Sequence, residues 1–290
     1  MFPTVAKITC NNYFTRSQTK AKPQLLTIPY SHYVEFSRWS LQLAKIEFDE
    51  VAFAPVQHVL PILNTRVNGN NGKRFTAGAG SATNVPILIF PNGDVLKDSW
   101  SIAEYSCNER IEDSLKELFD KQLGPLARRY AYSFLLKPAN ENRKIRDKIM
   151  TNSEFGYTWQ FAYNWILKFA VNRILIDRFK STDKECIEEC RMNLVRLFEN
   201  DLLNLVTKRK HKYLCGDSIS ITDIALCALA CPLVGHPKYC NGKYAEFIEL
   251  EEKDSEYKSD LEYWRNTVVS CFYFCLFIYE RLSHWHNTSR

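Results

Sequence analysis

The sequence predicts a small α/β domain followed by an all-helical domain, and three observations support this prediction. Before about residue 110, short apolar runs bounded by Pro or Gly follow the order strand, helix, strand, hairpin, helix. After Ile111, strand signals stop and apolar residues recur at helical spacing. The chain has 290 residues, 46% of them hydrophobic, which is enough for two cores. We expect an N-terminal arm over 1–23, the α/β domain over 24–110 and the all-helical domain over 111–290.

A strand, a helix and a second strand open the α/β domain. Residues 25–28 form a short apolar run, and residues 51–53 form another. Between them, Ser31 is a favourable N-cap for a helix that reaches about Lys45. This order predicts two parallel strands joined by a right-handed crossover.

A β-hairpin and a capped helix follow. Apolar residues at 87–90 and 95–96 flank Asn92-Gly93, a pair that tolerates the positive φ angles of a tight turn. Asp98 and Ser99 are N-cap residue types directly before the next helical pattern. The start of a helix leaves backbone N–H groups unpaired, so this point can hold a carboxylate or another anion.

Two segments lie outside these elements. Residues 64–84 are rich in Gly, Asn and Ala and form a long insertion without regular structure, which we expect to be exposed and mobile. No Gly-Lys-Ser/Thr follows it, so it is not a phosphate-binding loop. The first 34 residues contain no acidic side chain, which fits either an untargeted arm or an organellar transit segment.

The second half of the chain reads as helices. Apolar residues recur at helical spacing over 115–136, 157–179, 186–206, 224–233 and 261–282. Ser220 and Asp223 form a capping box, in which each side chain can bond the other's backbone N–H. This motif predicts a helix that begins directly after Ser220.

Composition excludes several functions. The ten cysteines include no Cys-x-x-Cys, which argues against a dithiol redox motif and common zinc sites, and we expect no metal. Three cysteine pairs spaced by four, 186/190, 227/231 and 271/275, are best explained as small apolar residues in helix cores. The net charge of +5 is small and only 208–212 forms a basic run, which does not favour nucleic-acid binding. No apolar run is long enough to span a membrane.

The chain resembles the glutathione transferase family from about residue 25 to its end. In that family a Val-Pro pair with a cis bond precedes the third strand, and an acidic residue followed by serine opens the next helix; here these are Val85-Pro86 and Asp98-Ser99. The stretch 31–41 is similar to the first helix of a less-studied branch, with His32 in place of its proline. The resemblance implies a thioredoxin-like N-terminal domain, an all-α helical-bundle C-terminal domain and a homodimer.

The resemblance also implies glutathione as co-substrate, with no metal. The Val85 backbone would pair with the peptide backbone of glutathione, Pro86 would fix that strand, and Asp98 and Ser99 would hold the γ-glutamyl end. Asp98 is one methylene shorter than the family's more frequent glutamate. The implied activity is attack of the thiolate on a hydrophobic electrophile or a peroxide, as in detoxification.

Ser31 is the candidate catalytic residue. A thiol with a pKa near 8.5 needs roughly 2.7 kcal/mol of preference for its anion to reach a pKa of about 6.5. A hydroxyl that donates a hydrogen bond to sulfur at a helix N-terminus can supply much of this. Ser31 can instead only cap its helix, and Tyr30 and Tyr33 are rival hydroxyls.

The electrophile would bind against the helical domain, where Arg129, Tyr130 and Ser133 are candidate lining residues. A non-catalytic interaction protein or a ligand-binding protein on the same scaffold is the alternative function. The cytoplasm is the expected compartment, with a mitochondrion or plastid as the alternative if residues 1–23 are a transit segment.

Overall fold

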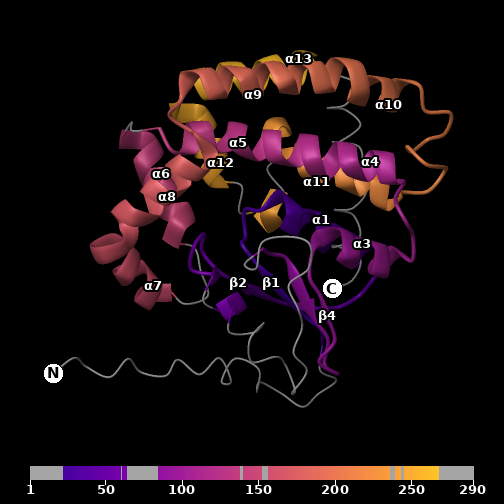
Figure 1. The fold of residues 1–290 in the computed structure, drawn as a ribbon, viewed down its shortest axis with the longest axis horizontal. Coiled ribbons are helices and arrows are strands. Elements are labelled where there is room, and N and C mark those ends of the chain that lie inside the picture. Colours follow the sequence, from indigo (N-terminus) through magenta and orange to yellow (C-terminus); the bar gives the residue numbers. More distant parts are fainter. Residues whose placement is uncertain are drawn as a thin grey trace.

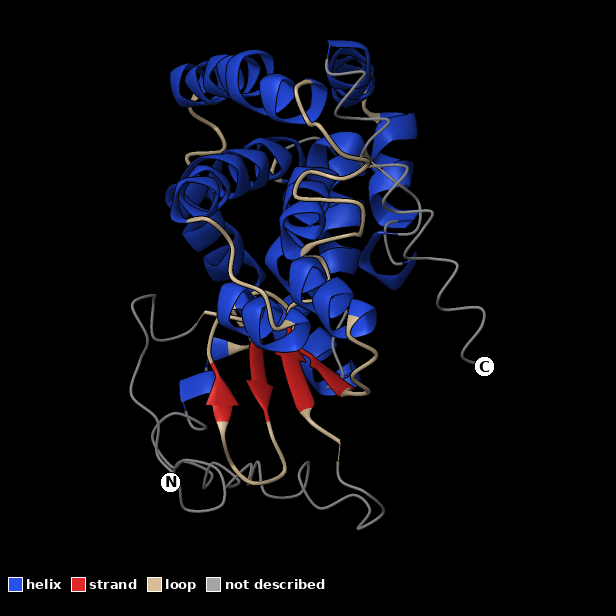
Figure 2. Cartoon of the chain, turned by 90° about the vertical axis from the view of Figure 1, so that its right-hand side faces the viewer, coloured by secondary structure: helices blue, strands red, loops and turns tan. Residues whose placement is uncertain are grey.

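The computed structural model describes residues 22–59, 61–63, 84–137, 140–151, 156–235, 239–242 and 245–267. The arm up to residue 21, residues 64–83 of the insertion and the cysteine pair 271/275 lie outside the described residues. A four-stranded sheet forms one end of the described chain, and helices are layered over it (Figures 1 and 2).

The first part of the chain has the predicted thioredoxin-like arrangement. Its elements are β1 (Gln24–Thr27), α1 (His32–Leu43), β2 (Asp49–Ala52), β3 (Ile87–Ile89), β4 (Val95–Leu96) and α3 (Ser99–Cys107). The strand order is β2-β1-β3-β4, in which β1 is parallel to β2 and β3 is antiparallel to both β1 and β4. The crossover unit and the hairpin are therefore confirmed, and Gly93 has a φ of 88° in the hairpin turn.

Alternation along the strands divides the sheet between two apolar clusters. One face packs Leu25 and Leu88 against Leu41 of α1 and Ile102 of α3. Residues on the opposite face form a second cluster: Leu26, Ile87 and Ile89 with Phe53 and Ile62. Because successive side chains on a strand point to opposite faces, the register of the sheet decides which residues meet α1.

The second part of the described chain is helical, as predicted. Its elements are α4 (Asp113–Glu117), η2 (Leu118–Leu123), α5 (Gly124–Leu135), α6 (Asn140–Thr151), α7 (Gly156–Ala162), η3 (Tyr163–Leu167), α8 (Lys168–Phe179), α9 (Lys184–Arg196), η4 (Leu197–Leu202), α10 (Leu203–Thr207), α11 (Ile221–Val234), η5 (Tyr239–Gly242), α12 (Ala245–Lys253) and α13 (Ser255–Thr267). Segments η2, η3 and η4 are π-turns that join neighbouring α-helices, and η5 is a short 3₁₀ helix. A domain boundary at 110/111 stays a prediction.

Helix α11 is the centre of the molecule, and all 14 of its residues are buried. Its predicted capping box is present: the Ser220 N–H donates to Asp223 Oδ2 at 2.8 Å, and the Asp223 N–H donates to Ser220 Oγ at 3.4 Å. Helix α1 lies between the sheet and α11, because Leu41 packs on the strands while Phe36 joins the helical core. The sheet and the helices are therefore held together through α1.

Two predictions from composition can be compared with the described chain. The basic run 208–212 is an exposed loop. Four cysteines of the predicted pairs form no disulfide within the described residues, and three of the four are buried: Cys186 and Cys190 on α9, and Cys227 and Cys231 on α11. Among the described helices, none combines the length and the apolar character needed to cross a bilayer. Within the same residues, no three His, Cys, Asp or Glu side chains gather as metal ligands would.

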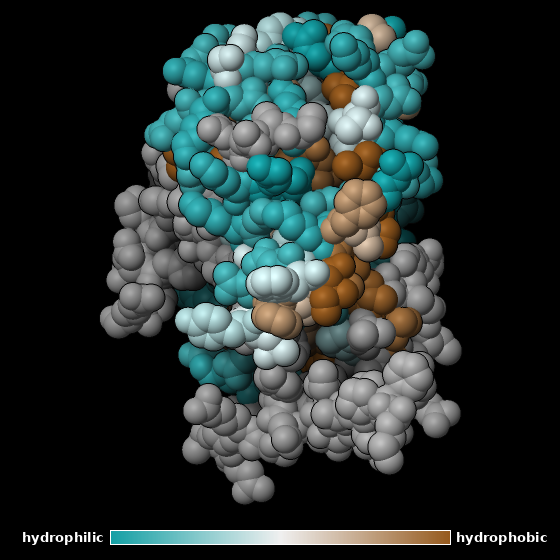
Figure 3. All heavy atoms as spheres, turned by 90° about the vertical axis from the view of Figure 1, so that its left-hand side faces the viewer, coloured by the Kyte–Doolittle hydropathy of each residue, from teal (hydrophilic) through white to brown (hydrophobic). Residues whose placement is uncertain are grey.

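One helix carries an exposed aromatic stripe. Tyr157, Phe161, Trp165 and Phe169, spaced by four along α7, η3 and α8, are 62–89% exposed. Ile166 beside them is also exposed. Figure 3 shows brown, hydrophobic side chains gathered on this side of the molecule, where Figure 1 places α7 and α8. Exposed apolar areas of this kind mark interaction surfaces.

Candidate functional site

The sheet topology brings the predicted site residues to one edge. Leu26 pairs with Ile87, so β1 ends where β3 begins. Leu96 pairs with Leu88, and β4 therefore leaves the sheet at this same edge. The chain then enters α1 after β1 and α3 after β4, and these two helices pack together. The N-termini of α1 and α3 and the segment before β3 therefore lie at a common edge of the sheet.

Ser31 occupies the N-cap position of α1. Its backbone is extended, with φ −81° and ψ 123°, and its N–H donates to the Ile28 carbonyl at 3.0 Å. The Ser31 hydroxyl makes no capping hydrogen bond, and the residue is partly exposed. Ser31 is therefore the N-cap residue by position, its hydroxyl makes no capping bond, and its catalytic role stays a prediction.

A buried ion-pair network holds the turn that carries Ser31. The Arg38 guanidinium donates to both carboxylate oxygens of Glu50, at 2.8 Å from Nε and 2.6 Å from Nη2, and it also binds Glu35. Its Nη2 donates to the Pro29 carbonyl at 3.2 Å, two residues before Ser31. Glu35 Oε1 accepts from the Cys240 N–H at 3.1 Å, which connects α1 to the helical part. Buried charges that are fully paired fix geometry, because any displacement would leave an ion unpaired in a poorly solvated region.

The Val85–Pro86 peptide bond is cis. Pro86 is buried and Val85 is partly exposed, directly before β3. The resemblance implied a cis bond at this pair, and the structure has it.

Asp98 and Ser99 lie at the N-terminus of α3, as expected. Asp98 is the exposed N-cap, and its two carboxylate oxygens accept from the N–H and the hydroxyl of Ser101, each at 2.9 Å. Ser99 is the first residue of the helix and is buried. The Asp98 carboxylate therefore has a fixed position before any ligand binds.

The rival hydroxyls have other surroundings. Tyr33 donates to the Asp120 carbonyl at 3.3 Å, and burial raises the pKa of its phenol, which therefore stays protonated. The Tyr30 ring lies 6.1 Å from the ring of Phe247. His32 is buried and donates from Nε2 to the Gly124 carbonyl at 3.1 Å. Burial, and then the charge of Arg128, lowers the pKa of His32 to about 3, so the ring is neutral at physiological pH and is only a weak base.

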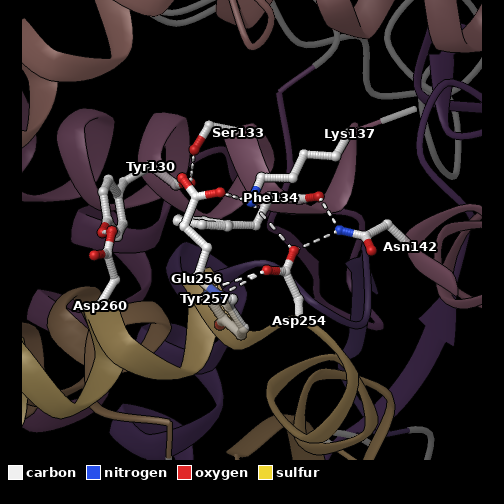
Figure 4. A network of polar contacts seen from close by, with 9 residues as sticks. All are labelled: Tyr130, Ser133, Phe134, Lys137, Asn142, Asp254, Glu256, Tyr257 and Asp260. Carbon is white, nitrogen blue, oxygen red and sulfur yellow. Dashed lines mark hydrogen bonds and ion pairs between the residues drawn. The ribbon is translucent and has the colours of Figure 1, made fainter. Parts of the chain in front are cut away.

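The residues predicted to line the electrophile site lie elsewhere. Tyr130 is buried and its hydroxyl binds Asp260 of α13 (Figure 4). Ser133 is also buried, and its hydroxyl donates to the Tyr130 carbonyl at 2.6 Å. Arg129 lies near Cys186 and Cys190 of α9: the pKa of Cys186 is raised mainly by its hydrogen bond with Asp183 and that of Cys190 mainly by burial, and the Arg129 charge opposes part of each rise. The expectation that Arg129, Tyr130 and Ser133 line the electrophile pocket of the helical part is therefore wrong for the buried Tyr130 and Ser133, and Arg129 faces α9.

Arg128 is the residue that the sequence interpretation missed. Gly124 and Arg128, four apart on α5, both approach the first turn of α1, and the Arg128 guanidinium lies 5.9 Å from the Tyr33 ring. A side chain at position 124 would overlap the Tyr33 ring, so glycine permits this close approach. The spacing Gly124, Arg128, Tyr132 was the available signal, because residues four apart share a helix face.

The chain is similar in structure to several solved proteins. A glutathione S-transferase from Methylobacillus flagellatus with glutathione bound is 17% identical, with a TM-score of 0.39, and the match covers 82% of this chain and 98% of that one. A glutathione S-transferase of Ceriporiopsis subvermispora in complex with glutathione is 14% identical, with a TM-score of 0.47, and the match covers 85% of this chain and 97% of that one. Glutaredoxin 2 from Salmonella typhimurium, also in complex with glutathione, is 16% identical, with a TM-score of 0.41, and the match covers 80% of this chain and 95% of that one.

No protein-family model matches this chain, and no curated protein matches its sequence. The fold assignment rests on the strand order of the sheet, on the crossover through α1 and on the helical second part. These features define a thioredoxin-like unit followed by a helical unit.

Proposed function

We propose that this chain is a glutathione transferase in which Ser31 stabilises the glutathione thiolate. The observation that carries the proposal is the position of Ser31: it begins α1 at the sheet edge shared with Val85-Pro86 and Asp98-Ser99, and its hydroxyl does not cap the helix. A hydroxyl placed there can donate to a sulfur anion, and the helix N-terminus favours the negative charge.

Glutathione would lie along this edge with its ends in different surroundings. The Val85 backbone would pair with the peptide backbone of glutathione, as a strand pairs with an added strand. Asp98 would attract the ammonium group of the γ-glutamyl end, and Ser99 would bind its carboxylate at the start of α3. The Arg38 network supports this function because it fixes the turn that presents Ser31.

The reaction that follows is nucleophilic attack by the thiolate. Its sulfur lone pair forms a bond to an electrophilic carbon, and the leaving group departs with its electron pair. With a peroxide, the sulfur lone pair forms a bond to one oxygen, the O–O bond breaks, and the other oxygen leaves with the bonding electrons as an alkoxide or hydroxide, so that the sulfur becomes a sulfenic acid. Serine has no thiol and cannot form a mixed disulfide with glutathione, which favours these reactions over removal of glutathione from proteins.

Variants of two serines test the catalytic role. Ser31→Ala should lower kcat/KM for conjugation of 1-chloro-2,4-dinitrobenzene by roughly a hundredfold, since one hydrogen bond to the anion is lost. Ser114→Ala is the matched control, because Ser114 is exposed on α4 and lies outside the site. A Ser31→Ala rate within about twofold of the wild type would exclude the role proposed for this hydroxyl. Absence of glutathione binding with a stable protein partner would favour the interaction-protein alternative.

We also propose a homodimer formed through the aromatic stripe of Tyr157, Phe161, Trp165 and Phe169. In an α-helix, residues four apart drift by about 40° per step around the axis. The π-turn η3 adds one residue, so that Tyr157 and Phe169 lie only about 20° apart in direction. The four rings therefore form a nearly straight row along three turns.

The area and charge of the stripe fit a second copy of the chain. Buried aromatic side chains contribute about 150–250 Å² each, so the stripe with Ile166 offers roughly 700 Å², close to the about 800 Å² per subunit of a standard interface. The exposed polar residues between the rings, Thr158, Gln160 and Asn164, are uncharged, and the partly exposed Lys168 is paired with Asp147. A two-fold axis near Trp165 would therefore bring no unpaired like charges of the stripe together, and it would place Phe161 opposite Phe169 of the other copy.

Sedimentation equilibrium tests this interface. The wild-type chain should be a dimer at micromolar concentration, Trp165→Glu should be a folded monomer, and Met192→Glu, which changes an exposed residue of α9, should stay a dimer. A wild-type monomer, or a dimer that persists in Trp165→Glu, would contradict the proposal. Binding of the monomer to lipid vesicles through the stripe would assign this surface to a membrane instead.

The proposed compartment is the cytoplasm. Cys227 and Cys231 are one turn apart on the buried helix α11, and neither forms a disulfide within the described part of the chain. Buried cysteines outside disulfides suit a reducing compartment. A fluorescent fusion at the C-terminus should give diffuse cytoplasmic signal, and signal confined to an organelle would support the transit-segment alternative.

A further inference from the structure

Two arginines lie beside a stacked aromatic pair near the start of α1. The rings of Tyr132 on α5 and Phe179 at the end of α8 are stacked, with centroids 4.3 Å apart and planes at 18°. The guanidinium carbon of Arg128 lies 5.4 Å from the Phe179 centroid, and that of Arg178 lies 5.9 Å from it. Two positive charges therefore lie at one aromatic surface.

Neither arginine has a carboxylate partner among the residues that the structure describes. Arg128 Nε is buried and has no hydrogen-bond acceptor there, whereas nearby Arg173 of α8 pairs with Asp177 at 3.0 Å. A guanidinium remains charged at every accessible pH, and a buried charged donor without a partner is costly. An anion bound at this place would remove that cost.

Arg128 also connects this cluster to the proposed glutathione site. Its guanidinium lies 5.9 Å from the Tyr33 ring, and Tyr33 is in the first turn of the helix that begins after Ser31. His32 is neutral, so the positive charge at this point comes from arginine. A small aromatic molecule held at Arg128 would therefore lie against the first turn of the helix that begins after Ser31.

We propose that Arg128 and Arg178 bind the anionic group of an aromatic carboxylate, which is the electrophilic acceptor of the proposed transferase. A guanidinium binds a carboxylate through two parallel hydrogen bonds, which a single ammonium cannot do. The rings of Tyr33, Tyr132 and Phe179 supply the surface against which a planar aromatic acceptor packs. An aliphatic anion would use the arginines but not the rings. The acceptor role, though not the anion site, rests on the proposed function.

Calorimetric titration with a matched pair of compounds tests the site without glutathione. The wild-type chain should bind 4-chloro-3-nitrobenzoate at least about tenfold more tightly than the neutral 4-chloro-3-nitrobenzamide. Arg128→Gln should remove this preference, and Arg178→Gln should reduce it. Arg173→Gln, a change on the same helix as Arg178, should bind both compounds as the wild type does. Urea unfolding of each variant establishes that it is folded.

The outcomes separate this inference from the proposed function. If the benzoate binds no more tightly than the amide, or binds Arg128→Gln as well as the wild type, the anion site is excluded. If the benzoate binds through Arg128 but the chain does not bind glutathione, the anion site stands and the acceptor role falls. If both bind, conjugation of the benzoate should fall about tenfold in Arg128→Gln, while glutathione binding changes by less than about twofold.

Discussion

The two sides of α5 differ in how their polar groups are satisfied. On the side that faces α13, Lys137, two residues after the end of α5, binds Asp254 at 3.2 Å and Glu256 at 2.8 Å, and Asn142 of α6 donates to Asp254 at 2.9 Å (Figure 4). On the side that faces α1 and α8, Arg128 has aromatic rings around it and no carboxylate partner within the described chain. Both sides carry charge, but only the first is neutralised.

This difference separates a structural contact from a candidate binding surface. A closed network stabilises the fold, and a ligand would have to break existing hydrogen bonds to enter it. An unpaired guanidinium gains from a ligand and contributes little to the fold alone. The charged groups beside α13, Lys137 and Asp254, should therefore affect stability, and Arg128 on the side of α1 should affect binding.

The largest stability effect is expected for Asp254. Its carboxylate accepts from Lys137 and Asn142 and also from the N–H groups of Glu256 and Tyr257, each at 3.1 Å, at the start of α13. Asp254→Ala should lower the free energy of unfolding by about 3 kcal/mol, because it removes the charged acceptor shared by Lys137 and Asn142 and also removes a helix cap. Urea unfolding measures this value.

The control for Asp254 is Asp113→Ala. Asp113 is exposed and lies 3.9 Å from Arg110, which is the upper limit of an ion pair. This change should cost less than about 0.5 kcal/mol. Equal losses in the two variants would mean that the α13 side of α5 is no more important to stability than the surface.

The second prediction concerns the pH dependence of stability, which we attribute to His32 on the side of α5 that faces α1. Burial lowers the pKa of His32 from 6.5 to about 3 in the folded chain. Between these values the unfolded chain binds a proton that the folded chain does not, so stability falls as pH falls below about 6.5. His32→Gln should remove about 2 kcal/mol of the stability difference between pH 7 and pH 5, measured by urea unfolding at both.

The wild-type and His32→Gln chains share every other titrating group, so their difference isolates His32. An identical pH dependence in the two chains would show that His32 titrates normally when folded. Arg128→Gln should raise the pKa of His32 measured by NMR, because the Arg128 charge is the second cause of its depression.

The smallest effect on stability is expected for Arg128 itself. Without ligand, Arg128→Gln should change the free energy of unfolding by no more than about 0.5 kcal/mol, since no ion pair is lost. A small rise in the free energy of unfolding of Arg128→Gln would also agree with the distinction between the two sides, because the substitution removes an unpaired charge. A loss comparable with that of Asp254→Ala would contradict the distinction between the two sides, and chemical denaturation at pH 7 measures it.

Local signals in the sequence were sufficient for much of the fold. Asn92-Gly93 predicted the hairpin, and Ser220 with Asp223 predicted the start of α11, because turn and cap chemistry depend only on near neighbours. The strand order of the sheet places Ser31, Val85 and Asp98 at one edge of the sheet. Their roles in binding stay predictions.

The sides of α5 could not be assigned from the sequence. The π-turn η2 directly before Gly124 adds a residue to the helix, which rotates everything after it by about 100°. Helical spacing in the sequence alone therefore could not show that Arg128 lies at α1 while Tyr130 lies at α13. The network of Arg38, Glu35 and Glu50 was also missed, because its members come together only through the crossover and the contact with η5.

The central claim is that Ser31 stabilises the thiolate of bound glutathione, and a pH titration of the thiolate ultraviolet absorbance tests it most directly. In the wild-type complex the thiol should ionise with a pKa of about 6.5, near two units below the value of about 8.5 for a free thiol, and Ser31→Ala should raise that pKa by at least about one unit. A chain that binds no glutathione, or a thiol that ionises at the same pH in the wild-type and Ser31→Ala complexes, would contradict the claim.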